Sequence, residues 1–236
     1  MIAVLDYGIG NLASAVKAFA HLGVDARLVA DPEEAAGADG VVLPGVGAFG
    51  PCIRALRRSG LDRAARSAAE GGVPFLGICV GFQMLFSGSE EEPSEAGLGL
   101  LDGTVRRLAT GYKLPQMQWN QLDPVAPDAA MLAGLPARPW MYFVHSYAPE
   151  PSADTVATCE YGGTVVAAAA RGNLWGTQFH PEKSGAAGLA LLANFAAMAG
   201  GTGRPGEPGL TPGPGEPGLA PGPGEPGLTP GPGEAA

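Results

Sequence analysis

Apolar runs, each followed by a glycine-rich turn and then by a segment of helical spacing, dominate the first part of this 236-residue chain. The runs IAVL, GVVLPG and VPFLGI, at residues 2–5, 40–45 and 73–78, are apolar throughout rather than alternating. Such runs are typical of strands buried on both faces of a sheet. Helical spacing follows in residues 11–23 and 51–72, so the pattern predicts a mostly parallel central sheet with helices on both faces.

The second half of the chain has a different pattern. Residues 103–108, 141–149 and 155–180 contain shorter apolar segments, and we expect shorter, partly antiparallel strands there. Residues 185–200, GAAGLALLANFAAMAG, have the composition of a closing helix. Residues 1–199 are therefore predicted to form one α/β domain with a smaller antiparallel portion.

The composition changes abruptly near Gly200. Residues 206–232 are three copies of a nine-residue unit, GEPGLTPGP, GEPGLAPGP and GEPGLTPGP. Their glycines recur at spacings of 3, 4 and 2 residues, which breaks the glycine-every-third-residue rule of a collagen triple helix. Because the segment has no aromatic residue and little apolar surface to bury, we predict that residues 200–236 form a disordered tail. A docking segment for a partner is the alternative.

Charge and hydropathy narrow the class of protein. The formal net charge is −9 and no basic stripe appears, so we expect no nucleic-acid partner. No apolar run approaches the length of a membrane helix, and the N-terminus lacks the cationic region of a secretory signal, so we expect no membrane association. Three scattered cysteines fit neither a disulfide framework nor a metal site. These features predict a cytoplasmic protein without a metal.

The segment FLGICVGFQ, residues 75–83, places Cys79 between Gly77 and Gly81 directly after a predicted strand. This is the G-x-nucleophile-x-G form of a strand-to-helix elbow. Glycines on both sides let neighbouring backbone approach closely, and a helix beginning beyond the sulfur favours the thiolate. The first N–H groups of that helix would also face an incoming carbonyl oxygen. The alternative is a small buried cysteine with a structural role.

A nucleophile of this kind needs a base, and the chain has only three histidines. His21 lies in the first predicted helix and is expected at the surface. His180 ends an apolar strand in the segment QFHPEKS, and Glu182 follows two residues later. A carboxylate beside an imidazole fixes its tautomer and stabilises its cation. The alternative for this segment alone is a strand-end histidine hydrogen-bonded in a loop, but a cysteine, a histidine and a carboxylate together form a nucleophilic triad.

Two glycine-rich turns allow further interpretations. The segment LPGVGAFG, residues 43–50, is either a source of oxyanion-binding N–H groups or an ordinary tight turn. The segment GIGNLA, residues 8–13, matches a relaxed dinucleotide-binding pattern, and Asp31 lies about 20 residues further on. A nicotinamide or flavin protein is therefore an alternative, although it gives Cys79 and His180 no function.

Six separated blocks together resemble a known family. GICVGFQ with FHPEKS is similar to the class I glutamine amidotransferases, in which a Cys-His-Glu triad lies on a three-layer, flavodoxin-like α/β fold. DYGIGN, PGVGAFG, QMQWN and YFVHSY narrow the resemblance to the glutaminase subunits of imidazole glycerol phosphate synthases. The resemblance covers about residues 2–199, and the repeat tail lies outside it.

The resemblance implies a reaction and a set of roles. Cys79 would attack the side-chain amide of glutamine, His180 would pass a proton to the leaving ammonia, and Glu182 would orient His180. No metal or organic cofactor is expected. The implied glutamine contacts are Gln83, His145, Ser146 and Tyr147. The implied oxyanion hole consists of Val80 with the loop residues Gly45, Val46 and Gly47.

The resemblance also implies a heterodimer with a cyclase subunit. That subunit would use the ammonia to form imidazole glycerol phosphate and AICAR in histidine biosynthesis, and its ligand would reorient the glycine loop. Residues expected near the partner or the ammonia passage are Asn11, Lys113, Met117, Trp119, Asn120, Tyr142 and Lys183.

The QMQWN block departs from the family pattern of H-M-G-W-N. Gln116 replaces the usual histidine and Gln118 the usual glycine. A positive φ at Gln118 would cost about 1 kcal/mol or more, and a bulky side chain there would affect the partner contact. The remaining alternatives are a glutaminase subunit of another synthase, which would lack this block and YFVHSY, and a non-catalytic scaffold for a synthase.

Overall fold

The computed structural model describes residues 1–200, and the predicted repeat tail after Gly200 lies outside the described residues. An eight-stranded sheet forms the centre of this region, in the order β2-β1-β3-β4-β12-β11-β10-β7. Its strands are β1 (Ile2–Leu5), β2 (Ala26–Val29), β3 (Gly40–Gly45), β4 (Phe75–Cys79), β7 (Asp123–Pro124), β10 (Thr155–Glu160), β11 (Thr164–Arg171) and β12 (Leu174–Thr177).

The pairing of neighbouring strands changes from parallel to antiparallel once along the sheet. The strands from β2 through β12 in the spatial order pair in parallel, whereas β11, β10 and β7 continue the sheet in antiparallel pairing. Two small antiparallel pairs lie outside the main sheet: β5 (Val105–Arg107) with β9 (Tyr147–Pro149), and β6 (Gln116–Gln121) with β8 (Trp140–His145). The predicted fold, a mostly parallel sheet with a smaller antiparallel portion, is confirmed.

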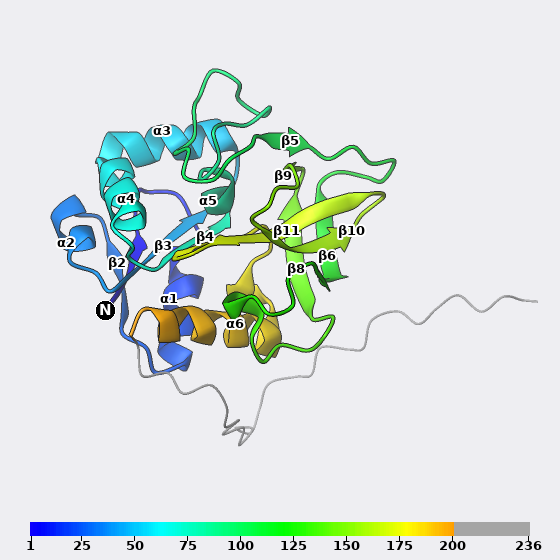
Figure 1. Ribbon diagram of the computed structural model, residues 1–236. Helices are drawn as coiled ribbons and strands as arrows, with labels where there is room; N and C mark the ends of the chain where they lie inside the picture. The colour runs from blue at the N-terminus through cyan, green and yellow to red at the C-terminus, as the bar shows by residue number, and fades with distance from the viewer. Residues whose placement is uncertain (201–236) are drawn as a thin grey trace, which may run out of the picture. The chain divides into compact units, whose positions relative to one another are not determined.

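Helices cover both faces of the sheet (Figure 1). One face carries α1 (Leu12–His21) and α6 (Gly185–Met198), whose Phe19 and Phe195 rings lie 6.2 Å apart. The other face carries α3 (Phe49–Ser59) and α4 (Leu61–Glu70), while α2 (Pro32–Ala36) lies near the β2 edge. Every residue of β3 and β4 is buried, as their uninterrupted apolar sequences predict. None of the helices within residues 1–200 is long and apolar enough to cross a membrane.

The backbone approaches itself very closely where β4 ends. A Cβ on Gly77 would lie 2.8 Å from Phe82 Cα, and a Cβ on Gly45 would lie 2.7 Å from the Gly81 nitrogen. A Cβ on Gly81 would collide with the carbonyl oxygen of Leu43. Glycine at these positions therefore lets the ends of β3 and β4 and the start of the next helix meet without side chains between them.

The helix predicted to begin after β4 is very short. It is a single turn, α5 (Val80–Gln83), and residues 84–86 follow it as a turn and a bend. A single turn has a small macrodipole, so the dipole contributes less to the thiolate than the sequence suggested. The loop that follows folds back over α5, because the Leu98, Leu100 and Leu101 N–H groups donate to carbonyls of residues 84 and 85.

Candidate active site

Cys79 lies in a strained conformation at the carboxyl end of a central strand. Its φ of 56° and ψ of −112° make it the one non-glycine residue with positive φ among residues 1–200. Such a conformation is costly and persists only where the surrounding packing enforces it, which is common at functional sites. The glycine contacts at the end of β4 supply that packing, and they leave the 4 % exposed cysteine at the floor of a cavity.

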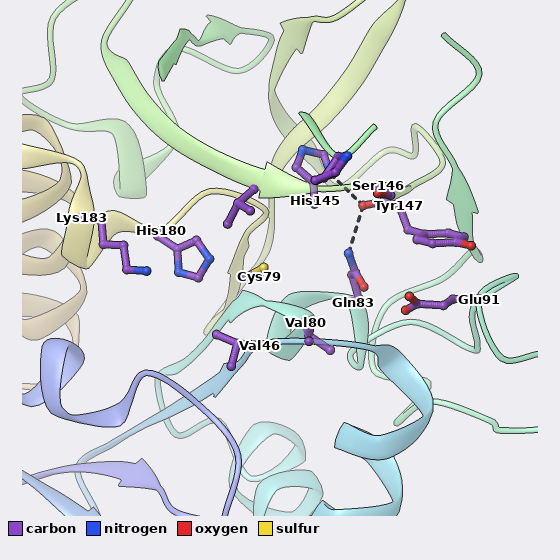
Figure 2. A pocket seen from close by; sticks show the side chains of 13 residues that line it. Val46, Cys79, Val80, Gln83, Glu91, His145, Ser146, Tyr147, His180 and Lys183 are labelled. Atoms are coloured by element: carbon purple, nitrogen blue, oxygen red, sulfur yellow. Dashed lines mark hydrogen bonds between the residues drawn. The ribbon is translucent and has the colours of Figure 1, made fainter. Parts of the chain in front are cut away.

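His180 and Glu182 reach the same place from β12. This strand pairs in parallel with β4, with Thr177 opposite Ile78, so the residues after both strands emerge side by side. The His180 Nδ1 and Glu182 Oε1 atoms are 2.8 Å apart, and the two side chains are only 2 % and 3 % exposed. Figure 2 shows the His180 ring beside the Cys79 sulfur. The structure thus brings together all three residues of the predicted triad.

The environment of His180 favours its protonated form. Burial by itself lowers the pKa of the imidazole, but hydrogen bonding and charge attraction from Cys79 and Glu182 outweigh it and raise the pKa from 6.5 to about 9. An imidazolium between a sulfur and a carboxylate can stabilise a thiolate on one side and is oriented on the other. This arrangement can attack an acyl carbon and then protonate a leaving group.

The cavity above Cys79 has a volume of about 390 Å³, which suits a molecule of amino-acid size. His180 and Lys183 lie at one end of it, and Tyr147 and Glu91 lie at the other (Figure 2). The full lining consists of Val46, Gly47, Cys79, Val80, Gln83, Glu91, Pro115, Val144, His145, Ser146, Tyr147, His180 and Lys183.

The predicted oxyanion-hole residues do not all face this cavity. Val46, Gly47 and Val80 line it, whereas Gly45 is buried against the Gly81 nitrogen and does not. Val80 is the first residue of α5, and the N–H groups of a first helical turn have no acceptor within the helix. Two side chains hold the glycine-rich segment at the end of β3. The Tyr7 hydroxyl donates to Pro44 O (2.6 Å), and the Cys52 thiol donates to Val46 O (3.3 Å).

The predicted glutamine-contact residues line the cavity, but Gln83 is engaged within the protein. Its amide nitrogen donates to Tyr147 O (3.0 Å) and to Gln178 Oε1 (3.1 Å). His145 Nδ1 lies 2.8 Å from the same Tyr147 oxygen. Because a carbonyl can only accept, His145 carries its proton on Nδ1, and its buried Nε2 has no partner within the described residues. The side chain of Gln83 therefore shapes the cavity wall rather than offering free N–H groups.

Two residues at the site carry no recognisable signal in the sequence. Glu91 lines the cavity and its Oε2 accepts the Phe49 N–H at 2.8 Å, but in the sequence it is one of several acidic residues in a loop. Gln178 Nε2 lies 3.8 Å from the Cys79 sulfur, and in the sequence Gln178 precedes the FHPE segment without any pattern of its own. Sequence reasoning missed both, because they reach the site only through the fold.

The residues expected near a partner lie in two groups. Met117 and Trp119 project from β6 with 63 % and 48 % exposure, and the Trp119 ring packs edge-on to Tyr142 of β8. Lys183 Nζ lies 6.0 Å from the Tyr142 ring centroid, which connects this surface to the cavity. Lys113 is exposed nearby, and Asn120 Nδ2 donates to Glu160 O at 2.8 Å. Asn11 lies away from β6, where it and Glu182 line the same small gap.

The two departures from the family pattern lie on the same face of β6 but differ in burial. Gln118 is exposed on a regular strand and has no positive φ, so the backbone strain expected for a left-handed residue does not arise. Gln116 is fully buried, and its Nε2 contacts the Cys159 sulfur at 3.7 Å. Cys159 and Cys52 are both buried, and burial raises the pKa of each thiol to about 11.

Asp31, the residue that a dinucleotide site would need, has a local role. It is the N-cap of α2, where its Oδ1 accepts the Glu33 N–H at 2.8 Å. An N-cap aspartate explains this residue without a ribose to bind.

The buried His145 predicts a loss of stability in mild acid. Burial is the main cause that lowers its pKa from 6.5 to about 4, so between these pH values the unfolded chain binds more protons than the folded one. The free energy of unfolding should therefore fall as the pH drops from 6.5 to 4, by roughly 3 kcal/mol in all. Urea unfolding of the wild type and His145→Gln across this range checks the effect. The prediction is contradicted if the free energy of unfolding changes with pH by the same amount in the wild type and in His145→Gln.

Comparison with known proteins places the chain in a family. The family Glutamine amidotransferase class-I matches residues 3–199. The chain therefore belongs to the class-I glutamine amidotransferases, as the sequence blocks indicated. A crystal structure of a glutamine amidotransferase, 22 % identical in sequence, has the same fold with a TM-score of 0.68 over 84 % of this chain and 98 % of that chain. The glutaminase domain of Trypanosoma brucei CTPS, 17 % identical, gives a TM-score of 0.58 over 83 % and 93 %.

More similar relatives narrow the family. The imidazole glycerol phosphate synthase subunit HisH of Symbiobacterium thermophilum is 50 % identical over 199 residues, which cover 84 % of this chain and 93 % of that protein. The HisH subunit of Moorella thermoacetica is 48 % identical over 208 residues, covering 87 % of this chain and 99 % of that protein. That of Synechococcus elongatus is 51 % identical over 199 residues, covering 82 % and 91 %.

Proposed function

We propose that this chain is the glutaminase subunit of an imidazole glycerol phosphate synthase. It hydrolyses glutamine to glutamate and passes the ammonia to a separate cyclase subunit. The observation that carries this proposal is the buried 2.8 Å His180–Glu182 pair beside Cys79, on the floor of a cavity of amino-acid size. The likeness to HisH subunits over nearly their whole length supplies the particular synthase.

The geometry supports a two-step acyl transfer. The Cys79 thiolate attacks the side-chain amide carbon of glutamine, and the negative charge moves to the amide oxygen, which the Val80 N–H and a peptide of the 45–47 loop receive. The carbon–nitrogen bond then breaks while the His180 imidazolium gives its proton to the departing nitrogen as ammonia. Water attacks the resulting thioester, His180 takes the water proton, and glutamate leaves as the thiolate is restored.

The other end of the cavity suits the amino-acid part of glutamine. Glu91 is the acidic side chain that lines this end, and its position fits a salt bridge to the α-ammonium group. The main chain of Ser146 and Tyr147 lies beside it and can bind the α-carboxylate or the ammonium. Glutamine bound in this direction places its side-chain amide over Cys79.

The exposed aromatic surface on β6 and β8 suits the cyclase. Large apolar side chains that project into solvent are typical of a protein interface, and aromatic residues dominate the energetics of such surfaces. This surface is connected to the cavity by the Tyr142–Lys183 contact, so a partner bound there lies close to the point of ammonia release. Its large exposed members are Met117, Trp119 and Trp140.

Replacing Trp119 by alanine is expected to weaken the complex with the cyclase by about 30-fold, because a buried interface tryptophan typically contributes about 2 kcal/mol or more. Isothermal titration of the two purified subunits measures this. Leu28→Ala is the matched control, since Leu28 is 46 % exposed on β2 at the far edge of the sheet. If Trp119→Ala and the wild type bind the cyclase with equal affinity, the interface does not include Trp119.

The test of the function is glutamate release from glutamine, measured with and without the cyclase subunit and its nucleotide ligand. We expect a strong increase when both are present. If the rate of glutamate release is the same with and without this cyclase, the chain is a glutaminase but serves another synthase. An absence of glutamate release under all conditions, with intact ammonia-dependent synthesis in the complex, would favour the scaffold.

A further inference from the structure

A buried glutamine outside the mechanism above contacts the reacting sulfur. Gln178 lies between β12 and His180 and is fully buried. Its Nε2 donates to Cys79 Sγ at 3.8 Å, and its Oε1 accepts from Gln83 Nε2 at 3.1 Å. It does not line the cavity, so it approaches the sulfur from the protein side, away from the substrate.

The hydrogen-bond chain that ends at the sulfur can run in only one direction. It starts at the backbone carbonyl of Tyr147, which can only accept, and therefore Gln83 must turn its NH₂ group toward it. The second hydrogen of that NH₂ group requires an oxygen opposite it, so Gln178 must turn its Oε1 toward Gln83. The NH₂ group of Gln178 is then left facing Cys79. A flip of either side-chain amide would place two donors or two acceptors against each other.

We propose that Gln178 is a catalytic residue whose side-chain N–H stabilises the Cys79 thiolate, and that Gln83 is a positioning residue that fixes the orientation of Gln178. A hydrogen bond to a charged group is stronger than one between neutral groups, and the buried setting excludes competing water. The thiolate is thus held from two sides, by the His180 imidazolium and by an amide that cannot rotate away. The catalytic part of this inference rests on the proposed glutaminase function, but the contact with the sulfur does not.

Isosteric variants separate donation from packing. Gln178→Glu keeps the shape and the acceptor for Gln83, but it puts a negatively charged oxygen where the N–H faces the sulfur. Gln178→Met keeps much of the volume and removes the donor without adding a charge. Gln83→Met leaves Gln178 in place but free to rotate. Thr177→Val is the control, because the Thr177 hydroxyl is equally buried but donates to Phe179 O instead.

The primary measurement is the thiolate absorbance near 240 nm at pH 7, taken as the difference from Cys79→Ala in each background. Cys52 and Cys159 do not contribute, since burial raises the pKa of each to about 11. We expect the thiolate-to-thiol ratio of Cys79 to fall about tenfold in Gln178→Met and Gln83→Met and further in Gln178→Glu. Thr177→Val should keep the wild-type ratio, and melting temperatures verify that each variant is folded.

Steady-state kinetics supply the second readout. Glutamate release in the complex should show a kcat that is lowered at least threefold in Gln178→Met, with the KM for glutamine unchanged, because Gln178 does not touch the cavity. A wild-type thiolate signal in Gln178→Met and Gln83→Met would overturn the proposal, as would the absence of any Cys79-dependent signal in the wild type. The absorbance measurement needs no glutamine, so this outcome is independent of whether the proposed function holds.

Discussion

Replacing Cys79 by alanine is expected to lower glutamine-dependent synthesis by the complex at least about 10⁴-fold, since the covalent route through the thioester is lost. Synthesis supplied with free ammonia should continue at the wild-type rate, because the cyclase reaction needs only the product of this subunit. The physical reason is that no other described side chain in the cavity offers a nucleophile paired with the His180–Glu182 system. The measurement is the ratio of the glutamine-fed to the ammonia-fed rate.

Cys159→Ala provides the control for this prediction. Cys159 is equally buried, but it contacts Gln116 on β6 and lies outside the cavity. It should retain the wild-type ratio of the two rates. If Cys79→Ala retained glutamine-fed synthesis, Cys79 would have a structural role and the proposed mechanism would be wrong.

Replacing Gly81 by alanine is expected to have the largest effect on stability. The added methyl group would collide with the carbonyl oxygen of Leu43, and the collision involves backbone on both sides, which no side-chain rotation relieves. We expect the free energy of unfolding to fall by at least about 3 kcal/mol, which corresponds to roughly 6–12 °C in melting temperature for a domain of this size. Thermal unfolding followed by circular dichroism measures the shift.

Gly111→Ala is the matched control, because a methyl group on Gly111 would have no heavy atom within 4 Å and the residue has no positive φ. Its melting temperature should stay within about 1–2 °C of the wild type, as is usual for exposed substitutions. A small effect of Gly81→Ala would mean that β3 and α5 can separate without cost. In that case the strained conformation of Cys79 would not depend on their close contact.

Prediction from the sequence was most successful where the signal is local. The apolar runs that became β1, β3 and β4 are uninterrupted because both faces of those strands are buried. The spacing of His180 and Glu182 across one proline is short enough to fix their contact, which the structure gives as 2.8 Å. The sequence predicts that a helix begins after Cys79 but not where it ends, since nothing local signals that the chain leaves the helix at residues 84–86, where the following loop hydrogen-bonds to it.

The sequence by itself determined the parallel α/β order and the elbow at Cys79. It also identified the site residues that lie within the short blocks of the family resemblance. Each of these features is recognised from neighbouring residues in the chain. Only the tertiary structure decided that Glu91 closes one end of the cavity, that Gly45 faces the protein rather than the substrate, and that Gln83 and Gln178 form a one-directional path to the sulfur. Gln83 and Gln178 are 95 residues apart in the chain, and their contact exists only because β4 and β12 are neighbours in the sheet. Hydrogen-bond direction in a buried network is set by every partner at once, and no single segment of sequence contains that information.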